Sequence, residues 1–250
     1  MATWGQRRQA MYIGTFLVIV LALVVPVILS ALPRASCTDG RKNQGEHDID
    51  CGGPCVTVCL SEVAPVANLW ARPFKVAEGV YSAVSFVSNR NSNVLAHNVP
   101  YTIKLYDKKN ILIAERHGVT DVLPKSDFPI FEGGIETGKT EVGEVYFEFN
   151  SAPVWERVTK EQPKLTVLTP TITLLPTPKV VVTIRNDSAQ NLKETLVDVV
   201  LFDKEGNAVN ASETVLPALK KNESSEVVFT WLSAFSGEVN RIEVYPKGVR

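Results

Sequence analysis

The sequence predicts a mainly β protein with an N-terminal transmembrane helix, a short disulfide-rich module and two antiparallel β-sandwich domains. Three observations predict this architecture. Residues 10–32 contain no charged side chain, all four cysteines lie between positions 37 and 59, and most of the rest alternates apolar and polar residues. Alternation with a period of two is typical of strands that have one face on a core and the other in solvent.

Composition excludes several classes of protein. The chain has 250 residues, of which 45% are hydrophobic and 21% are charged, so it is not largely disordered. Its 26 basic and 27 acidic residues leave a formal net charge of -1. Nucleic-acid binding would require a basic domain or stripe. We therefore expect no nucleic-acid partner.

The uncharged run at residues 10–32 predicts a transmembrane helix. At about 1.5 Å of rise per residue it spans roughly 30–35 Å, which is enough to cross the apolar core of a bilayer. Arg7 and Arg8 precede the run, and no acidic residue comes before them. Because positive charges stay on the cytoplasmic side, we expect residues 1–9 to be cytoplasmic and the later domains to be extracytoplasmic.

Two other kinds of N-terminal segment compete with this anchor. A cleaved signal peptide has an apolar region of about 7–15 residues, and the run here is longer. A lipoprotein signal has small residues before a lipidated cysteine, as in Ala35-Ser36-Cys37. However, Arg34 stands where that signal requires an aliphatic residue. We therefore favour an uncleaved, single-pass anchor.

Residues 33–62 form a polar module that contains every cysteine. Almost no apolar residue lies between the first two cysteines, so burial cannot hold this segment together. Cys37, Cys51, Cys55 and Cys59 therefore predict two disulfides, with three connectivities open. The alternative is a zinc site with four thiolates, but structural zinc usually takes close cysteine pairs, and the intervals here are 13, 3 and 3 residues.

The same module holds a cluster of oxygen donors beside glycines that permit sharp turns. Oxygen donors of this kind bind calcium, although their spacing is not that of an EF-hand. The donors are Asp39, Asn43, Glu46, Asp48 and Asp50. Calcium is therefore the only cofactor that the sequence suggests, and the other interpretation is a solvated polar loop.

The module also resembles a short motif that is common in bacterial surface proteins. The segments that match it are CTDGRKNQGE, from Cys37 to Glu46, and DCGGPC, from Asp50 to Cys55. The resemblance implies a secreted or surface location, and it implies no activity.

Beyond Leu60 the apolar pattern is that of strands. One face of a predicted strand carries Val99, Tyr101, Ile103 and Leu105, and the other face carries Thr102, Lys104 and Tyr106. Residues 180–184, 227–231 and 242–244 alternate in the same way. Strands of this length between clusters of Asn, Gly, Pro and Ser indicate antiparallel sandwiches.

The β region contains two copies of one unit. The first copy has Leu105-Tyr106-Asp107 followed by Asn110, and the second has Leu201-Phe202-Asp203 followed by Gly206. In each copy the Asp is expected to begin a turn, which Asn or Gly ends because these residues tolerate a left-handed backbone. Two further segments match: residues 88–91 with 185–188, and residues 122–124 with 215–217. We therefore expect Leu105 and Leu201 to be equivalent inward positions.

At these residues the chain resembles the FxLYD family of bacterial envelope domains, whose name describes a strand that ends in Leu-Tyr-Asp. Ile103 and Val199 stand where the family has Phe. The resemblance implies immunoglobulin-like sandwiches outside the membrane, which we place at residues 63–158 and 159–250. The order of anchor, cysteine module and two such domains is similar to that of membrane-anchored proteins of candidate-phyla bacteria.

No catalytic motif accompanies these features. The sequence has three histidines and no zinc-protease, serine-hydrolase or phosphate-loop pattern. We therefore expect a non-enzymatic protein of the cell envelope that binds, adheres or scaffolds. Its expected partners are the membrane, through the anchor, and an envelope protein or polysaccharide.

The alternative is an accessory subunit or an enzyme that acts on cell-wall polymer. A carbohydrate-binding surface would require two or more solvent-facing aromatic residues on one sheet. Trp70, Trp155 and Trp231 are the candidates, although packing in a core is the simpler interpretation of Trp231 because it ends an alternating apolar set.

Overall fold

The computed structural model describes residues 4–31, 35–159, 162–235 and 237–247. The ends of the expected cytoplasmic segment, of the anchor and of the second sandwich therefore lie partly outside the described residues. The chain forms two compact units, Met1–Cys55 and Val56–Arg250. The first unit holds a helix and most of the cysteine module, and the second holds the β-sandwiches.

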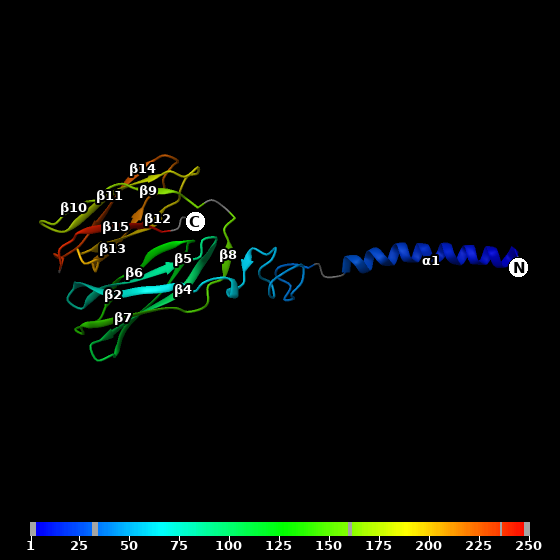
Figure 1. Cartoon of the computed structure of the whole chain (residues 1–250), viewed down its shortest axis with the longest axis horizontal. Helices are drawn as coiled ribbons and strands as arrows, with labels where there is room; N and C mark the ends of the chain where they lie inside the picture. The colour runs from blue at the N-terminus through cyan, green and yellow to red at the C-terminus, as the bar shows by residue number, and fades with distance from the viewer. Residues whose placement is uncertain (1–3, 32–34, 160–161, 236, 248–250) are drawn as a thin grey trace. The chain divides into compact units, whose positions relative to one another are not determined.

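The first unit begins with helix α1, Trp4–Ala31, drawn in blue in Figure 1. The helix starts six residues before the uncharged run, so it includes Arg8. The span Trp4–Ile28 has a mean hydropathy of 2.7, and the most apolar part of it is 0% buried. The helix is therefore long and apolar enough to cross a membrane. The rest of the described chain does not cover its apolar side chains, as expected of a helix that packs in lipid.

From residue 35 to residue 55, the described part of the first unit is a series of turns without a regular helix or strand. The one ladder contact within these residues is an antiparallel bridge between Asp48 and Cys51. Cys37 and Cys55 form a disulfide with 5.7 Å between their Cα atoms. Cys51 and Cys59 are disulfide-bonded as well, which leaves no free cysteine among the described residues. The cysteines are therefore disulfides rather than zinc ligands.

In the second unit, the first sandwich contains two antiparallel sheets. The inner sheet has β3 between β2 and β6: β2 is Ala67–Ala77, β3 is Val80–Asn89 and β6 is Ser126–Glu136. The outer sheet is built around β4, Val94–Asp107, which pairs with β5, Leu112–Val122, with β7, Val142–Phe149, and with β8, Trp155–Arg157. The short strand β1, Thr57–Val58, pairs with β8, and the 3-10 turn η1, Leu60–Glu62, follows it.

The second sandwich also has two antiparallel sheets. One is built around β11, Lys179–Asn186, which pairs with β9, Leu165–Val167, with β10, Thr171–Thr173, and with β14, Ser224–Thr230. The other has β12, Thr195–Phe202, between β13, Ala208–Leu216, and β15, Arg241–Pro246. The fold is therefore mainly β, as the alternation in the sequence predicts.

The two sandwiches have the same strand connections. Strands β4, β5 and β7 of the first correspond to β12, β13 and β15 of the second, because each central strand pairs with the next strand and with the last long one. Strands β3 and β6 correspond in the same way to β11 and β14. The internal repeat in the sequence therefore corresponds to a repeat in topology.

The turns after β4 and β12 have the same hydrogen bonds. Asp107 N–H donates to the carbonyl of Ile111, and Asp203 N–H donates to the carbonyl of Asn207. Each aspartate also accepts a hydrogen bond on Oδ1 from the residue four positions on. Asn110 and Gly206, with φ of 59° and 82°, end the two turns in the left-handed region.

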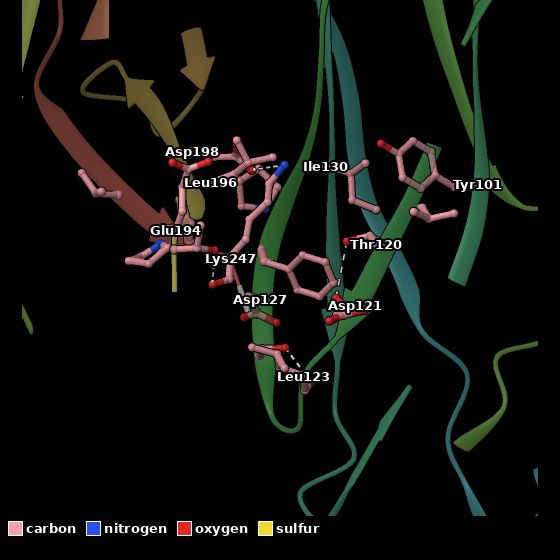
Figure 2. A pocket seen from close by; sticks show the side chains of 18 of the residues that line it. Tyr101, Thr120, Asp121, Leu123, Asp127, Ile130, Glu194, Leu196, Asp198 and Lys247 are labelled. Carbon is pink, nitrogen blue, oxygen red and sulfur yellow. Dashed lines mark hydrogen bonds and ion pairs between the residues drawn. The ribbon is translucent and has the colours of Figure 1, made fainter. Parts of the chain in front are cut away.

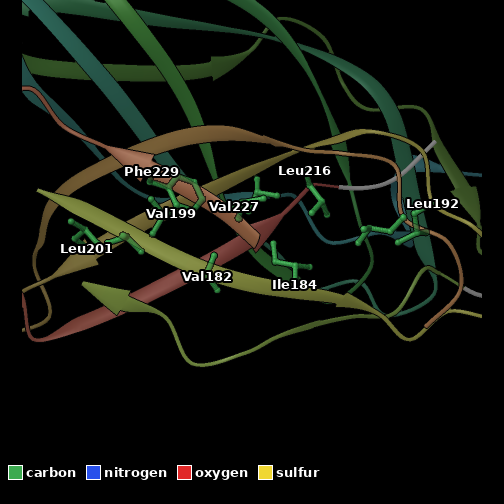
Figure 3. Close-up of a cluster of buried hydrophobic side chains, with 11 residues drawn as sticks. Val182, Ile184, Leu192, Val199, Leu201, Leu216, Val227 and Phe229 are labelled. Atoms are coloured by element: carbon green, nitrogen blue, oxygen red, sulfur yellow. The ribbon is translucent and has the colours of Figure 1, made fainter. Parts of the chain in front are cut away.

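Each sandwich has its own apolar core. Leu105 lies in the core of the first and Leu201 in the core of the second, and both are 0% exposed. Figure 3 shows side chains of the second core, where Val199 and Leu201 of β12 face Val182 and Phe229 from the opposite sheet. Burial of these faces stabilises each sandwich through the hydrophobic effect.

Strand β12 departs from the expected pattern because both of its faces are buried. Val197, Val199 and Leu201 point into their own core. Asp198, Val200 and Phe202 alternate with them and are also buried. Val200 and Phe202 join a separate cluster with Phe74 and Val84 of the first sandwich. The sheet around β12 therefore packs on the sheet around β3, and we call this contact the interface between the sandwiches.

Aromatic side chains dominate this interface. Trp70 stacks on Phe86, with ring centroids 5.2 Å apart, and meets the ring of Phe202 edge-on at 6.5 Å. Phe86 meets Tyr245 edge-on at 5.5 Å. At its edge, Arg72 donates a hydrogen bond of 3.0 Å to the side chain of Asn207. Contacts of this kind hold the two sandwiches together as one body.

Candidate functional site

A cavity of about 460 Å³ lies where the two sandwiches meet (Figure 2). We call it the seam cavity. The first sandwich contributes residues of β5 and β6 and Tyr101 of β4, and the second contributes β12, β15 and the residues beside them. Its polar lining residues include Thr120, Asp121, Asp127, Lys193, Glu194, Asp198 and Lys247.

Strand register places the central acidic group of this cavity. Asp198 stands opposite Glu213 of β13 and Tyr245 of β15. Its neighbours along the chain, Val197 and Val199, point into the core, so the pleat turns Asp198 toward the first sandwich. Lys247 comes directly after β15. Its backbone N–H donates a 2.9 Å hydrogen bond to the carbonyl of Leu196 in β12, which keeps Lys247 beside that strand.

Asp198 is a buried carboxylate that forms an ion pair with Lys247. It is 1% exposed, and neither Oδ1 nor Oδ2 accepts a hydrogen bond in the described part of the chain. Nζ of Lys247 lies 3.4 Å from Oδ2 of Asp198, and it donates a hydrogen bond to Glu213 instead. The attraction of Lys247 offsets part of the cost of burying this carboxylate, because it replaces some of the lost hydration.

Burial shifts the proton affinity of this group. Desolvation raises the pKa of Asp198 well above its usual range, and Glu213 raises it further, although the attraction of Lys247 opposes both. Burial lowers the pKa of Lys247, but the attraction of Asp198 and Glu213 outweighs that effect and leaves it raised. The lysine is therefore charged, while the aspartate binds a proton more readily than an exposed one.

The opposite wall carries a second polar pair. Tyr101 is 5% exposed, and its hydroxyl donates a 2.8 Å hydrogen bond to Oε1 of Glu132. Burial raises the pKa of Tyr101, and the charge of Glu132 adds to the shift. Of the residues that line the cavity itself, Asp121 and Asp127 belong to the first sandwich and Glu194 and Asp198 to the second, so acidic side chains border it on both sandwiches.

A second, shallower hollow of about 240 Å³ lies on the outer sheet of the first sandwich. Tyr106, Asn110, Glu144 and Tyr146 line it, and we call it the tyrosine face. Tyr106 and Tyr146 point away from the core on neighbouring strands, and Tyr146 is 51% exposed. Beside them, Lys104 and Glu148 form an ion pair of 2.6 Å.

The three candidate tryptophans of the sandwiches do not form an exposed platform. Trp70 lies in the interface between the sandwiches, and Trp155 is 2% exposed in the core of the first sandwich. Trp231 packs on Phe235 and donates a hydrogen bond to Asn210. The solvent-facing pair on the outer sheet consists of Tyr106, which lies in the repeat motif predicted from the sequence, and Tyr146, which no sequence pattern singled out.

The residues of the repeat motif have different surroundings in the two copies. Tyr106 lies on the tyrosine face, whereas Phe202 is 4% exposed in the interface, with the guanidinium of Arg241 4.5 Å from its ring centroid. Asp107 and Asp203 bond the backbone of their own turns. Hydrogen bonds from the backbone lower the pKa of Asp203.

The expected calcium donors are mainly engaged within the cysteine module. Asp50 accepts hydrogen bonds from the N–H groups of Asp39 and Gly40. Asp39 accepts hydrogen bonds from the Asn43 side chain and from Arg41 N–H, and the first of these contributes most to lowering its pKa. Asp48 accepts a hydrogen bond from Ile49. These contacts show a structural use of the acidic groups and leave calcium binding as a prediction.

Glu46 is the buried acid of the module. It is 5% exposed and accepts a hydrogen bond from Asn43 N–H. Its Oε1 lies 3.3 Å from Sγ of Cys55. Within the described residues, the one group of three potential metal ligands is Cys37, Glu46 and Cys55, and its two sulfurs are joined in the disulfide.

The sequence did not reveal the seam cavity. The signal that could have found it is the run Val197-Asp198-Val199-Val200-Leu201-Phe202, which is apolar on both faces except for one acid. A continuous apolar run indicates a strand that is buried on both sides. An acid inside such a run is therefore a candidate for a buried functional group.

Comparisons with known proteins do not assign this arrangement to a family. No protein-family model matches the chain, and no curated protein matches it. The likeness to FxLYD domains therefore stays a prediction that depends on the Leu-aromatic-Asp turns. The class that the structure itself defines is a tandem β-sandwich protein with an N-terminal apolar helix and a disulfide module.

Proposed function

We propose that this chain is a single-pass membrane protein whose β-sandwiches bind or scaffold on the extracytoplasmic side of the cell envelope, without catalysis. One observation carries the proposal: two sandwiches joined by a buried aromatic interface follow an apolar helix and a disulfide module. A rigid body on a membrane anchor suits the presentation of a surface to a partner.

Two further features support the location. Disulfides persist in oxidising compartments, and this chain has all of its described cysteines in disulfides. The arginines before the helix favour a cytoplasmic N-terminus. The likeness to FxLYD envelope domains agrees with both.

The test is membrane fractionation combined with protease protection in intact cells. We expect the full-length chain to remain in the membrane after carbonate washing and its sandwiches to be digested only from outside. Replacing Leu21 and Val24 in the helix with Lys should release the chain, because a charge at the bilayer centre costs about 2.5–3.5 kcal/mol. The control is Leu112→Lys on the sandwich surface. A mature N-terminus at Cys37, or sandwiches protected inside the cell, would contradict the proposal.

A second candidate function is polysaccharide binding by the tyrosine face, as an accessory to cell-wall chemistry. The observation that favours it is the presence of two outward-facing aromatic rings on one sheet beside a carboxylate and an amide. Sugar rings stack on aromatic faces, while their hydroxyls bond to groups such as Glu144 and Asn110.

This second candidate is tested by sedimentation of the protein with purified, insoluble cell-wall polymer. Tyr106→Ala and Tyr146→Ala should each reduce the bound fraction, and the double variant should abolish binding. The control is Ile111→Ala, because the side chain of Ile111 lies next to Asn110 in the chain and is 57% exposed. Equal binding by the double variant and the control would exclude the tyrosine face as the sugar site.

A further inference from the structure

We propose that Lys247 and Asp198 react within the folded chain to form an isopeptide bond, with Glu213 as the carrier of the protons. In this bond the side-chain nitrogen of the lysine is joined to Cγ of the aspartate as an amide. The second sandwich brings an amine, a buried carboxyl group and a second acid into contact, and these are the groups that the reaction requires.

The order of the strands brings the three groups together. Asp198 lies in β12, the middle strand of its sheet, and Glu213 stands directly opposite it on β13. Lys247 comes after β15, on the other side of β12, and its Nζ bonds Glu213. The lysine side chain therefore crosses β12 beside Asp198, and its Nζ lies 3.4 Å from Oδ2 (Figure 2). Because Cγ is bonded to that oxygen, the fold has already brought the reacting groups together, which removes the entropic cost of their encounter.

Burial puts the carboxyl group into its reactive state. A carboxylate anion resists attack by an amine, whereas a protonated carboxyl group accepts an electron pair at carbon. Asp198 is 1% exposed, and desolvation raises its pKa well above the usual range. The attraction of Lys247 opposes this shift without cancelling it. The fold therefore favours a protonated acid directly beside the lysine.

Glu213 supplies the proton transfers. Lys247 is charged in the resting pair, so Glu213, which bonds its Nζ, first accepts a proton from it. The electron pair of the neutral amine then attacks Cγ of Asp198, and a C–N bond forms. Glu213 returns the proton to one hydroxyl of the intermediate, the C–O bond breaks and one water molecule leaves. Glu213 finally takes the extra proton from the nitrogen and releases it to solvent.

Other lysine–glutamate pairs of the chain lack these surroundings. Lys104 and Glu148 approach to 2.6 Å, and so do Lys108 and Glu141, but each of these side chains is at least 25% exposed. Water keeps both members of such a pair charged, and they form ordinary ion pairs. The burial of Asp198 and the adjoining acid distinguish the pair with Lys247.

The inference goes beyond the anchored-scaffold proposal and does not depend on it. The bond would hold the end of β15 against β12 whether or not the chain is anchored in a membrane. It also separates two forms of Asp198. A free carboxyl group exists only in the unlinked chain, so the pH dependence of Asp198 belongs to that form.

The experiment is mass spectrometry of the full-length chain, purified in detergent and then reduced and alkylated so that disulfides no longer join peptides. We expect an intact mass that is lower by one water molecule than the mass of the sequence. Trypsin should yield a branched peptide that joins residues 194–204 to residues 242–250, because an acylated Lys247 is not cleaved. This peptide lies outside the apolar helix, so the result is independent of how the N-terminus is processed.

Two results would overturn the inference directly. One is the recovery of the two peptides separately, without loss of water. The other is loss of water without the branched peptide, which would indicate an aspartate that has cyclised onto its own backbone. Fragmentation of the branched peptide identifies the linked residue, and a link at Glu194 or Asp203 would also contradict the proposal.

Three variants assign the reacting groups. Lys247→Arg keeps the positive charge but has no amine to acylate, so the branched peptide should disappear. Glu213→Gln removes the proton acceptor, so linkage after a pulse of synthesis should slow by about 100-fold or more, as loss of general acid–base catalysis predicts. Lys204→Arg is the matched control, because Lys204 pairs with Glu205 in an exposed turn, and it should link as the original chain does.

The variants also have outcomes that oppose the inference. A branched peptide of this kind in Lys247→Arg would show that another residue supplies the amine. Linkage at the original rate in Glu213→Gln would overturn the role of Glu213 as proton carrier. If Lys247→Arg does not fold, the fragmentation of the branched peptide from the original chain decides.

Discussion

Asn89 and Asn186 hold the same position in the two sandwiches and bond the backbone in the same way. Each ends the central strand of its sheet and is at most 1% exposed. Oδ1 of each accepts the N–H of the residue two positions on, Asn91 or Ser188. The amide nitrogen of Asn89 donates to the carbonyl of Leu123, and that of Asn186 donates to the carbonyls of Gln190, Leu219 and Lys220. A buried amide thus joins the end of a strand to the loop that follows a different strand.

Replacing either asparagine with alanine should destabilise the protein. Asn186→Ala leaves the buried N–H of Ser188 without its acceptor, and an unsatisfied buried group costs about 1–3 kcal/mol. Asn89→Ala should cost less, because its amide nitrogen donates to one carbonyl. Urea denaturation measures both. The control is Gln190→Ala, an exposed position where we expect a change within about 0.5 kcal/mol. An equally small change at Asn186 would show that water replaces its bonds.

Leu105 and Leu201 should be equally sensitive to truncation. Each is fully buried in the core of its own sandwich, so Leu→Ala should cost about 2–5 kcal/mol through lost burial and the cavity left behind. The matched control is Leu112→Ala, because Leu112 is 48% exposed on the outer sheet. Denaturant midpoints provide the comparison. A nearly neutral effect at either buried leucine would contradict the equivalence of the two copies.

Asp198 should make the folded protein less stable as pH rises. Its folded-state pKa is raised above the usual 3.8, so the folded chain binds a proton that the unfolded chain releases at lower pH. This stabilising contribution is full below about pH 3.8 and is lost as pH rises through the folded-state pKa. Asp198→Asn should remove that part of the pH dependence and raise stability near neutral pH. Thermal unfolding between pH 3 and pH 8 tests this, and an unchanged slope in the variant would assign the effect to another group.

The cysteine module should be fully oxidised in the native protein. Thiol titration of unreduced protein should find no free cysteine, and peptide mapping should recover Cys37 linked to Cys55. Cys37 and Cys55 are separated by 18 positions. Because closing a loop of about this size contributes roughly 3 kcal/mol in the chain-entropy model, Cys37→Ser with Cys55→Ser should loosen the module. Faster proteolysis near Glu46 would report this change. Four titratable thiols would contradict the disulfides.

Calcium binding requires a separate measurement. If the donors of the module share an ion, millimolar calcium should raise its resistance to proteolysis and give heat in a calorimeter. Asp48→Asn is the informative variant, because the side chain of Asp48 accepts a hydrogen bond from the N–H of its chain neighbour Ile49 and does not hold a distant turn of the module in the described residues. No heat and no protection would leave the acidic side chains as acceptors for the turns of the module.

The repeat could be predicted from the sequence, but the interface between its two copies could not. Leu-aromatic-Asp turns are local, because Asp107 and Asp203 bond residues at most four positions away. The seam cavity instead brings together residues from Tyr101 to Lys247, and no local pattern specifies that approach. Tyr106 and Phe202 illustrate the difference: one motif position faces solvent in the first copy and the interface in the second.

The interface between the sandwiches joins two surfaces that are not equivalent. The first sandwich uses the sheet around β3, and the second uses the sheet around β12, which corresponds to β4 of the first. A head-to-tail contact of this kind has no symmetry that closes it. Each chain therefore keeps two sheets that this contact does not use, the sheet around β4 in the first sandwich and the sheet around β11 in the second. If further chains repeated the contact through these sheets, they would form a fibre. Side-chain chemistry opposes such growth. Lys104 and Glu148 on the free sheet of the first sandwich, and Arg185 and Glu226 on that of the second, place charges where polymer contacts would require apolar rings.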